Sequence, residues 1–381
     1  MKRLSALSIG AIALVSAVAF VPPSGAASAP KLGRPCARVG QVSGGLTCTA
    51  SGTKRMWAAT QATAAPTSAV TATTPTAPTT PTTTPQVAAA TSEKLPAKLI
   101  FAPVPAENAI VTASNWAPFV KALSDRVGIP IEQVATTDYA GVTEGVLAGK
   151  VDIAMYGPLS YYIAVQAGAK LKGVAIQTSA FGASETYQSY LFTKAGRTDI
   201  NTIADVKGKK VCFGDPESTS GTLFPYLMLA DAGIDTQKDI TNVVAGAHDK
   251  SILAVANGSC DAGFAFDAIV TTPSGAAAGV KASDLKIIQK SKPIPNSPIA
   301  IRTDLPASLV QKLQKAIPDI DALYLQGNNY CPSSAPRCGP GSLAANQQQS
   351  WKAVTSDAWF EPVASACKLP AAPSSCRPAK K

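Results

Sequence analysis

The stretch Leu99-Ile100-Phe101-Ala102-Pro103-Val104 opens the part of the chain whose pattern decides the fold. A short apolar run of this length predicts a buried strand, and Ser114–Val127 after it has the spacing of an amphipathic helix. The same alternation continues through the predicted strands Ile131–Thr136, Val151–Tyr156 and Leu171–Thr178, with the helices Ala140–Ala148 and Ser160–Ala167 between them. Strands that alternate with helices predict a parallel sheet covered on both faces.

The alternation starts again after Arg197. The second set contains the predicted strands Lys210–Phe213, Asn242–Ala245 and Ala262–Phe266, and the helices Thr219–Ala232 and Asp249–Asn257. We therefore predict an α/β fold of two doubly wound sheets, joined by crossing segments near Tyr187–Thr193 and Ile299–Arg302. Two such lobes form a clamshell that closes on a ligand at the carboxyl ends of the strands.

The segments around this region suggest an exported protein of several parts. Lys2 and Arg3 precede the apolar run Leu7–Val21, which predicts a signal peptide. From Gln61 to Ser92, 26 of 32 residues are Thr, Ala or Pro, a composition that cannot bury a core. The predicted parts are a signal peptide (1–29), a small disulfide-closed module (30–60), a linker (61–95), a two-lobed domain (96–366; first lobe about 98–187 and 300–366, second lobe about 188–299) and a basic, disulfide-containing tail (367–381).

Two features bear on where the protein resides. Apart from the signal, no stretch has the length and apolar character of a membrane-spanning helix. The first cysteine, Cys36, follows Gly33-Arg34-Pro35, whereas a lipid-anchored binding protein has small residues directly before its cysteine. We predict an extracellular or envelope-associated protein that is not lipidated, with the module 30–60, of a kind found in exported actinobacterial proteins, as a candidate contact with the cell envelope.

The net charge of +10 does not indicate a nucleic-acid binder, because the excess lies at the ends of the chain. Residues 98–366 contain 22 basic and 23 acidic residues. A nucleic-acid-binding domain needs a basic face on its folded part, which this balance does not provide.

Eight cysteines in an exported chain predict a set of disulfides. Sequence neighbours favour Cys36–Cys48, Cys331–Cys338 and Cys367–Cys376, which leaves Cys212–Cys260. With one histidine and no C-x-x-C spacing, the sequence predicts no metal site and no cofactor.

The run Gly214-Asp215-Pro216-Glu217-Ser218-Thr219-Ser220-Gly221-Thr222-Leu223 lies between a predicted strand and a predicted helix. One hydroxyl is enough to cap a helix, but here Ser218, Thr219 and Ser220 all stand at its start. Together with the free N–H groups of the first turn and the helix dipole, they indicate an anion-binding site. An ordinary helix cap is the alternative reading.

His248 and Asp267 belong to the same predicted edge. His248 opens a helix after the run Val243–Ala247, and Asp267 follows the strand that ends at Phe266. A lone histidine is more often structural, and an aspartate at a strand end is often a solvated turn residue. At this edge, however, His248 can donate to an anion, and Asp267 can select a protonated ligand oxygen or orient a donor.

Three motifs carry a family resemblance: Asp138–Val142 (DYAGV) with Asp152–Pro158 (DIAMYGP); Ser218–Gly221 (STSG); and Gly246–Asp249 (GAHD) running to Asp267. With their order and spacing, residues 98–317 resemble the phosphate/phosphite/phosphonate-binding proteins of ABC importers (PhnD-like). The resemblance implies the type II periplasmic-binding-protein fold, an ABC permease as partner, and a phosphorus oxyanion as ligand. It also implies that Ser218, Thr219, Ser220 and His248 grip the oxyanion, that Tyr139 and Tyr187 close over it, and that Asp267 is an acidic ligand contact.

One departure concerns the ligand. Aminophosphonate binders of this family carry a second acidic residue after an Ile-Pro pair, but here the stretch reads Ile294-Pro295-Asn296-Ser297-Pro298. Its absence weakens the case for an amine-bearing ligand.

Two alternatives to a monomeric transport protein stay open. The chain could be a sensor displayed on the Thr/Pro spacer. It could also be an enzyme on the same fold that uses Ser220, His248 and Asp267, although no G-x-S-x-G motif is present and we predict no catalytic residue.

Overall fold

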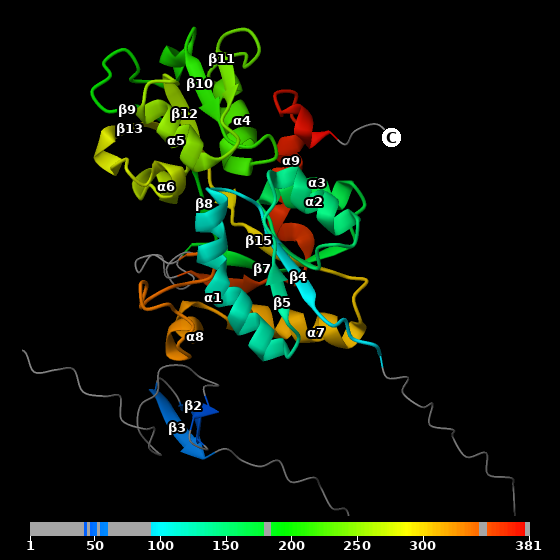
Figure 1. Ribbon diagram of the computed structural model, residues 1–381. Helices are drawn as coiled ribbons and strands as arrows, with labels where there is room; N and C mark the ends of the chain where they lie inside the picture. The colour runs from blue at the N-terminus through cyan, green and yellow to red at the C-terminus, as the bar shows by residue number, and fades with distance from the viewer. Residues whose placement is uncertain are drawn as a thin grey trace, which may run out of the picture. The chain divides into compact units, whose positions relative to one another are not determined.

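The computed structural model describes residues 42–43, 46–51, 54–59, 93–178, 184–342 and 349–377 (Figure 1). The chain divides into two units, Met1–Val87 and Ala88–Lys381. The first contains a small antiparallel sheet of β1 (Val42–Ser43), β2 (Leu46–Ser51) and β3 (Lys54–Ala59). The expected signal peptide, Cys36 with its predicted bond to Cys48, and linker residues 61–92 lie outside the described residues. Within the described part, no helix has the length and apolar character needed to cross a membrane.

The first lobe of the second unit is built on a six-stranded sheet of order β16-β7-β15-β6-β4-β5. Its strands are β4 (Leu99–Pro103), β5 (Ile131–Gln133), β6 (Ile153–Met155), β7 (Leu171–Thr178), β15 (Pro298–Arg302) and β16 (Ser350–Ala353). The helices of this lobe are α1 (Ala109–Val127), α2 (Tyr139–Leu147), α3 (Pro158–Gln166), α7 (Ala307–Ala316), α8 (Ala322–Gly327) and α9 (Glu361–Cys367).

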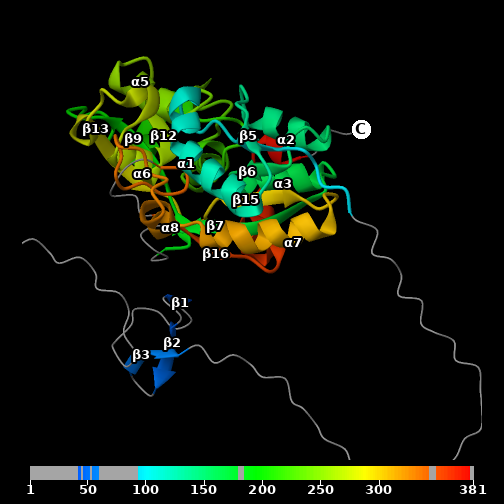
Figure 2. The ribbon, with the colours of Figure 1, turned by 60° about the horizontal axis from the view of Figure 1, so that its bottom comes forward.

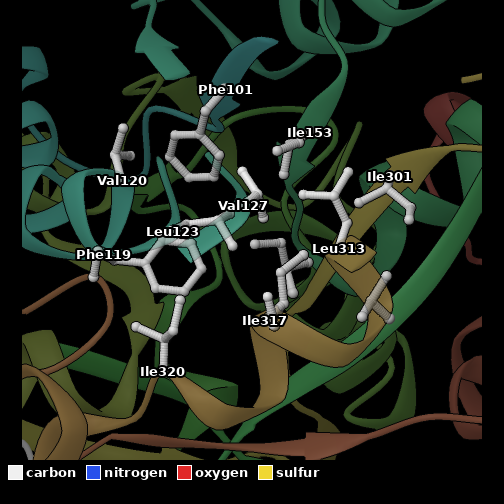
Figure 3. Packing of buried hydrophobic residues seen from close by; sticks show 14 of the residues in the cluster. Phe101, Phe119, Val120, Leu123, Val127, Ile153, Ile301, Leu313, Ile317 and Ile320 are labelled. Carbon is white, nitrogen blue, oxygen red and sulfur yellow. The ribbon is translucent and has the colours of Figure 1, made fainter. Parts of the chain in front are cut away.

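Alternate residues of these strands pack on opposite faces of the sheet, as the two-residue period of a strand requires. Leu99 and Phe101 of β4 face α1 and α7 and belong to one core. Figure 3 shows Phe101 packed among the side chains of this core. Trp116 of α1 and Trp351 of β16 stack within this core, with ring centroids 6.3 Å apart. On the other face, Ala102 packs with side chains of α2 and α3. The predicted two-sided coverage is therefore confirmed.

The second lobe is a five-stranded sheet of order β11-β10-β12-β9-β13. Helices α4 and α5 pack on its opposite faces (Figure 1). Helix α6 follows β12 (Figures 1 and 2). The elements are β9 (Ser189–Lys194), β10 (Lys210–Phe213), α4 (Phe224–Asp231), β11 (Thr241–Val244), α5 (His248–Ala256), β12 (Ala262–Phe266), α6 (Asp267–Thr271) and β13 (Leu285–Lys290).

The sheets are mixed, so the prediction of parallel sheets is right only for part of each. The β5-β4-β6 and β11-β10-β12 pairings are parallel. The strands that cross between the lobes, β9 and β15, run antiparallel to β12 and β6. A strand that crosses from the other lobe enters its new sheet at the edge that faces the interlobe cavity. It therefore runs opposite to the parallel strands of that sheet, which end at this edge. Beside the crossings, β8 (Thr186–Tyr187) pairs with β14 (Ile294–Pro295).

Three of the predicted disulfides are present: Cys212–Cys260, Cys331–Cys338 and Cys367–Cys376. The third closes a loop after α9, in the segment that the sequence sets apart as a basic tail. Cys367 and Cys376 are buried in a cluster with Leu159 of the first lobe and Leu223 of the second. Residues 367–377 are thus packed against both lobes.

Candidate functional site

A cavity of about 670 Å³ lies between the two lobes. Its wall includes all seven ligand-binding residues predicted from the sequence, namely Tyr139, Tyr187, Ser218, Thr219, Ser220, His248 and Asp267. First-lobe residues at the ends of β4 and β6 face second-lobe residues at the ends of β10 and β12. The structure therefore brings together side chains that are up to 128 positions apart in the chain.

The Ser218–Ser220 run begins a wide helical turn. Ser218 has extended backbone angles, and its Oγ accepts the N–H of Gly221 at 3.0 Å, so it is a true N-cap. Residues Thr219–Leu223 form a π-helical turn that leads into α4. Within the described chain, the N–H groups of Thr219 and Ser220 have no protein acceptor. Two backbone donors and the buried hydroxyls of Thr219 and Ser220 are therefore available to an anion at this helix start, beside the buried Ser218 hydroxyl.

Pro225 explains why the first turn can be wide. It has no N–H, so it cannot bond to the carbonyl group of Ser220 or Gly221. Both carbonyls find other donors: Ser220 O accepts the Ser189 hydroxyl at 2.6 Å, and Gly221 O accepts the Gly214 N–H at 2.9 Å. A Cβ on Gly221 would lie 2.9 Å from the Cα of Gly214, so only glycine allows this approach.

His248, the first residue of α5, completes an anion-binding cluster with Ser218, Thr219 and Ser220, which we call the cradle. Its ring is buried, packs edge-on against Phe266 and places Nε2 3.1 Å from Ser218 Oγ. Burial lowers the pKa of His248 to about 4, so the imidazole is neutral at physiological pH. Among the described residues, Nδ1 has no hydrogen-bond partner. The described wall contains no Lys or Arg, so an anion would be held by neutral donors alone.

Two tyrosines from the first lobe and the crossing segment face this cradle. Burial raises the pKa of Tyr187 to about 12, although the hydroxyls of Ser220 and Thr219 partly offset the effect. Burial and then the Asp215 carboxylate raise the pKa of Tyr139 well above its ordinary value. Both phenols stay protonated and can donate to an oxyanion.

Asp267 faces the same cavity at the end of β12. Its carboxylate accepts the N–H of Ala268 at 2.8 Å and that of Gln188 at 3.2 Å. Burial nevertheless raises its pKa. A carboxylate held in this way can accept a hydrogen bond from a protonated ligand oxygen.

Direct hydrogen bonds join the lobes around the cavity. Leu159 N donates to Thr219 Oγ1 at 2.8 Å, and His248 N donates to Ala106 O at 3.1 Å. Asn108 N donates to the fully buried Asp249 carboxylate at 2.9 Å. The structure is therefore a closed form in which cradle residues themselves contact the first lobe.

The sequence did not identify several wall residues. Glu107 lies between β4 and α1, lines the cavity and accepts the Ser274 hydroxyl at 2.6 Å. Its position just after a strand was an available signal, since this is the edge where ligands bind. Gln177, Asn296 and Gln349 also line the cavity. Asn296 lies in the stretch after Ile294-Pro295 that the sequence singled out for its missing carboxylate, whereas nothing local in the sequence distinguishes Gln177 and Gln349 from surface amides.

Four carboxylates meet beside the cradle. Asp138 and Glu144 belong to the first lobe, and Asp215 and Glu217 to the second. Burial first, and then repulsion by Asp215, Asp138 and Glu144, raises the pKa of Glu217 to about 7. Its Oε2 is buried and has no partner within the described chain. Ionisation of Glu217 therefore opposes the closed, folded state.

Glu217→Gln should make the protein more stable at about pH 8 and leave stability at about pH 5 unchanged. The folded-state pKa lies above the ordinary value of 4.5, so the wild type loses stability as pH rises through this interval. The full shift corresponds to roughly 3 kcal/mol, and solvent screening of this partly exposed group reduces our expectation to about 1 kcal/mol. Denaturant unfolding at both pH values measures it, with the exposed Glu361→Gln as control. Equal effects of Glu217→Gln at both pH values would contradict the assignment.

Comparisons with known proteins agree with this geometry. Residues 101–359 match the family model described as the periplasmic substrate-binding protein of a phosphonate ABC transporter. The phosphate-import protein PhnD of Mycolicibacterium smegmatis is 34% identical over 290 residues, which cover 74% of this chain and 88% of that protein. The phosphonates-binding periplasmic protein of Escherichia coli is 34% identical over 209 residues, covering 52% of this chain and 59% of that protein.

Solved structures show the same fold. The binding component of an ABC phosphonate transporter from Pseudomonas aeruginosa superposes with a TM-score of 0.60 at 26% identity, covering 71% of this chain and 85% of that one. PhnD1 of Prochlorococcus marinus in complex with methylphosphonate gives a TM-score of 0.59 at 18% identity, covering 71% and 97%.

Proposed function

Because the chain belongs to the family of periplasmic substrate-binding proteins of phosphonate ABC transporters, we propose that it captures a small phosphorus oxyanion and delivers it to an ABC importer. The candidates are phosphite, a phosphonate and phosphate. The observation that carries the proposal is the helix start at Ser218–Ser220, where hydroxyls and backbone N–H groups converge on the interlobe cavity. As a transport component, the protein needs no catalytic step.

The ligand-binding residues have distinct roles in this proposal. Thr219 and Ser220 donate hydrogen bonds to the oxyanion from the second lobe. Ser218 and neutral His248 share one hydrogen bond and together supply one further donor: His248 Nδ1–H if Ser218 donates to Nε2, or the Ser218 hydroxyl if Nε2–H donates to Ser218. Tyr139 and Tyr187 donate from the other side, so that the anion is bonded to both lobes. A ligand held in this way favours closure, because it has bonds in the closed form that the open form cannot provide.

Asp267 gives the site a means of selection. Its carboxylate repels a fully ionised anion but accepts a hydrogen bond from an anion that keeps one proton. Phosphate carries such a proton near neutral pH, and sulfate does not. We propose that Asp267 discriminates against sulfate in this way.

The family implies an exported or envelope-associated protein. We propose a non-lipidated chain in which the module 30–60 contacts the cell envelope and residues 61–95 are the spacer. In this proposal the binding domain 96–366 acts as a monomer.

Melting curves with a panel of anions test the function. Phosphite, methylphosphonate and phosphate should raise the melting temperature, since a ligand at about 100 times its Kd adds about 2.7 kcal/mol. Sulfate is the matched control and should have little effect. A response to none of the phosphorus anions would refute the function, whereas an equal response to sulfate would refute only the role of Asp267.

A further inference from the structure

The cavity is larger than its oxyanion cradle requires. A volume of about 670 Å³ falls in the range of pockets that hold drug-sized ligands. Phosphite and methylphosphonate have only a handful of non-hydrogen atoms, and the cradle residues alone can surround them. The remaining space must therefore be explained by water or by a substituent on phosphorus.

The additional space lies to one side of the cradle. In the first lobe, Tyr139 and Leu159 contact Ser218 and Thr219 of the cradle from the first turns of α2 and α3, which follow β5 and β6. The opposite wall is formed by Gln177 at the end of β7, Asn296 before β15 and Gln349 before β16, which we call the amide wall. The sheet order β16-β7-β15-β6 puts these strands one to three positions from β6, or roughly 5 to 15 Å away.

The amide wall offers uncharged donors and acceptors. Gln177 Nε2 donates to Gln349 Oε1 at 2.9 Å and to Pro340 O at 3.1 Å, which fixes the pair. Within the described chain, Gln177 Oε1, Gln349 Nε2 and the side-chain amide of Asn296 have no protein partner. Polar atoms of both kinds are thus available to a ligand in one part of the cavity.

The carboxylates of the cavity suit the same chemistry. Glu107 and Asp267 already accept protein hydrogen bonds but have further lone pairs. A hydroxyl group can donate to such a carboxylate and also accept from an amide N–H. An ammonium group can donate to the carboxylates but cannot accept from the amide N–H groups, and a plain alkyl group makes no hydrogen bond with the wall, which is then left to water.

We propose that the ligand is an organophosphorus anion with an uncharged, hydroxylated substituent that lies against the amide wall. This inference rests on the proposed function, since the oxyanion end occupies the cradle at Ser218–Ser220. The substituent end then determines which phosphonate or phosphate ester is preferred.

Calorimetric titration of the full-length chain with three phosphonates tests the inference. 2,3-Dihydroxypropylphosphonate should bind about tenfold or more tightly than methylphosphonate and 2-aminoethylphosphonate. The near-isosteric variants Gln177→Met and Asn296→Leu should each weaken binding of the dihydroxypropyl compound by about tenfold, with about a twofold change or less for methylphosphonate. Gln237→Met, at an exposed glutamine outside the cavity, is the control and should bind all three compounds as the wild type does.

The outcomes distinguish failure of the hydroxylated substituent from failure of the oxyanion function. If methylphosphonate binds as tightly as the dihydroxypropyl compound, or if the amine compound binds best, the hydroxylated substituent is wrong and the oxyanion function stands. Unchanged affinity in both wall variants would also reject it. If none of the three phosphonates binds but phosphate or phosphite does, the inference fails and the oxyanion function stands. If no phosphorus anion binds while the protein melts cooperatively, both the inference and the oxyanion function fail.

Discussion

Thr219→Ala should weaken binding of phosphite or methylphosphonate by roughly 10- to 150-fold. The Thr219 hydroxyl accepts the N–H of Leu159 from the first lobe, which leaves its proton for a ligand in the cavity. Loss of one hydrogen bond to a buried anion costs about 1.5–3 kcal/mol, at about 1.4 kcal/mol per tenfold in Kd. The same hydroxyl also joins the lobes, so the observed loss should lie toward the upper end. Calorimetric titration measures the affinity.

Thr222→Ala is the matched control for this experiment. Thr222 lies in the same turn and is also buried, but its hydroxyl donates to Asp215 O at 2.7 Å and does not line the cavity. It should lose stability and keep its affinity. If Thr219→Ala behaves like Thr222→Ala, the Ser218–Ser220 run is an ordinary helix start and the oxyanion cradle is wrong.

Removal of the Cys212–Cys260 bond should lower the free energy of unfolding by about 2–4 kcal/mol. The bond links Cys212 in β10 to Cys260, two positions before β12, and closes a loop of 48 positions. For a loop of this length the chain-entropy relation gives about 4 kcal/mol. Both cysteines are buried, so the double variant with alanine also loses packing. Denaturant unfolding of Cys212→Ala/Cys260→Ala measures the effect.

The Cys331–Cys338 bond provides the comparison, because its loop spans only 7 positions. The same relation gives roughly 2 kcal/mol for a loop of this length, so its removal should cost less. An equal loss in the two double variants would show that loop length does not set the effect. Free thiols at Cys212 and Cys260 in peptide mapping without reduction would show that the bond is absent.

The local pattern of apolar residues was sufficient to predict the strands that lead to the cradle. The predicted bounds of β10 and β12 agree with the structure, because a short apolar run between turns has few other ways to be buried. The wide first turn before α4 was not predicted. It depends on Pro225 and on hydrogen-bond donors from Gly214 and Ser189. Ser189 is 31 positions away from its acceptor Ser220, so no local pattern reveals this contact.

The direction of a strand in its sheet and the contacts between distant residues were harder to predict than whether a segment forms a helix or a strand. The antiparallel course of β9 and β15 follows from the path of the chain between lobes, which periodicity does not encode. The start of α1 at Ala109, five positions before the predicted start at Ser114, depends on the Asn108 cap, which Asp249 of the other lobe holds in place. Likewise, Glu107 and the amide wall acquire a role only when distant strand ends meet.

The stacked pair Trp116 and Trp351 gives the cavity a built-in optical signal. Trp116 lines the cavity, and its indole lies 6.3 Å from that of Trp351 in the core. The emission of an indole depends on the polarity around it, so replacement of water by a ligand changes the colour of the emitted light. Excitation passes readily between rings at this separation, and the second indole therefore shares the change. We therefore expect a ligand that occupies the cavity to shift the tryptophan emission of the chain, which a fluorimeter measures without an attached dye.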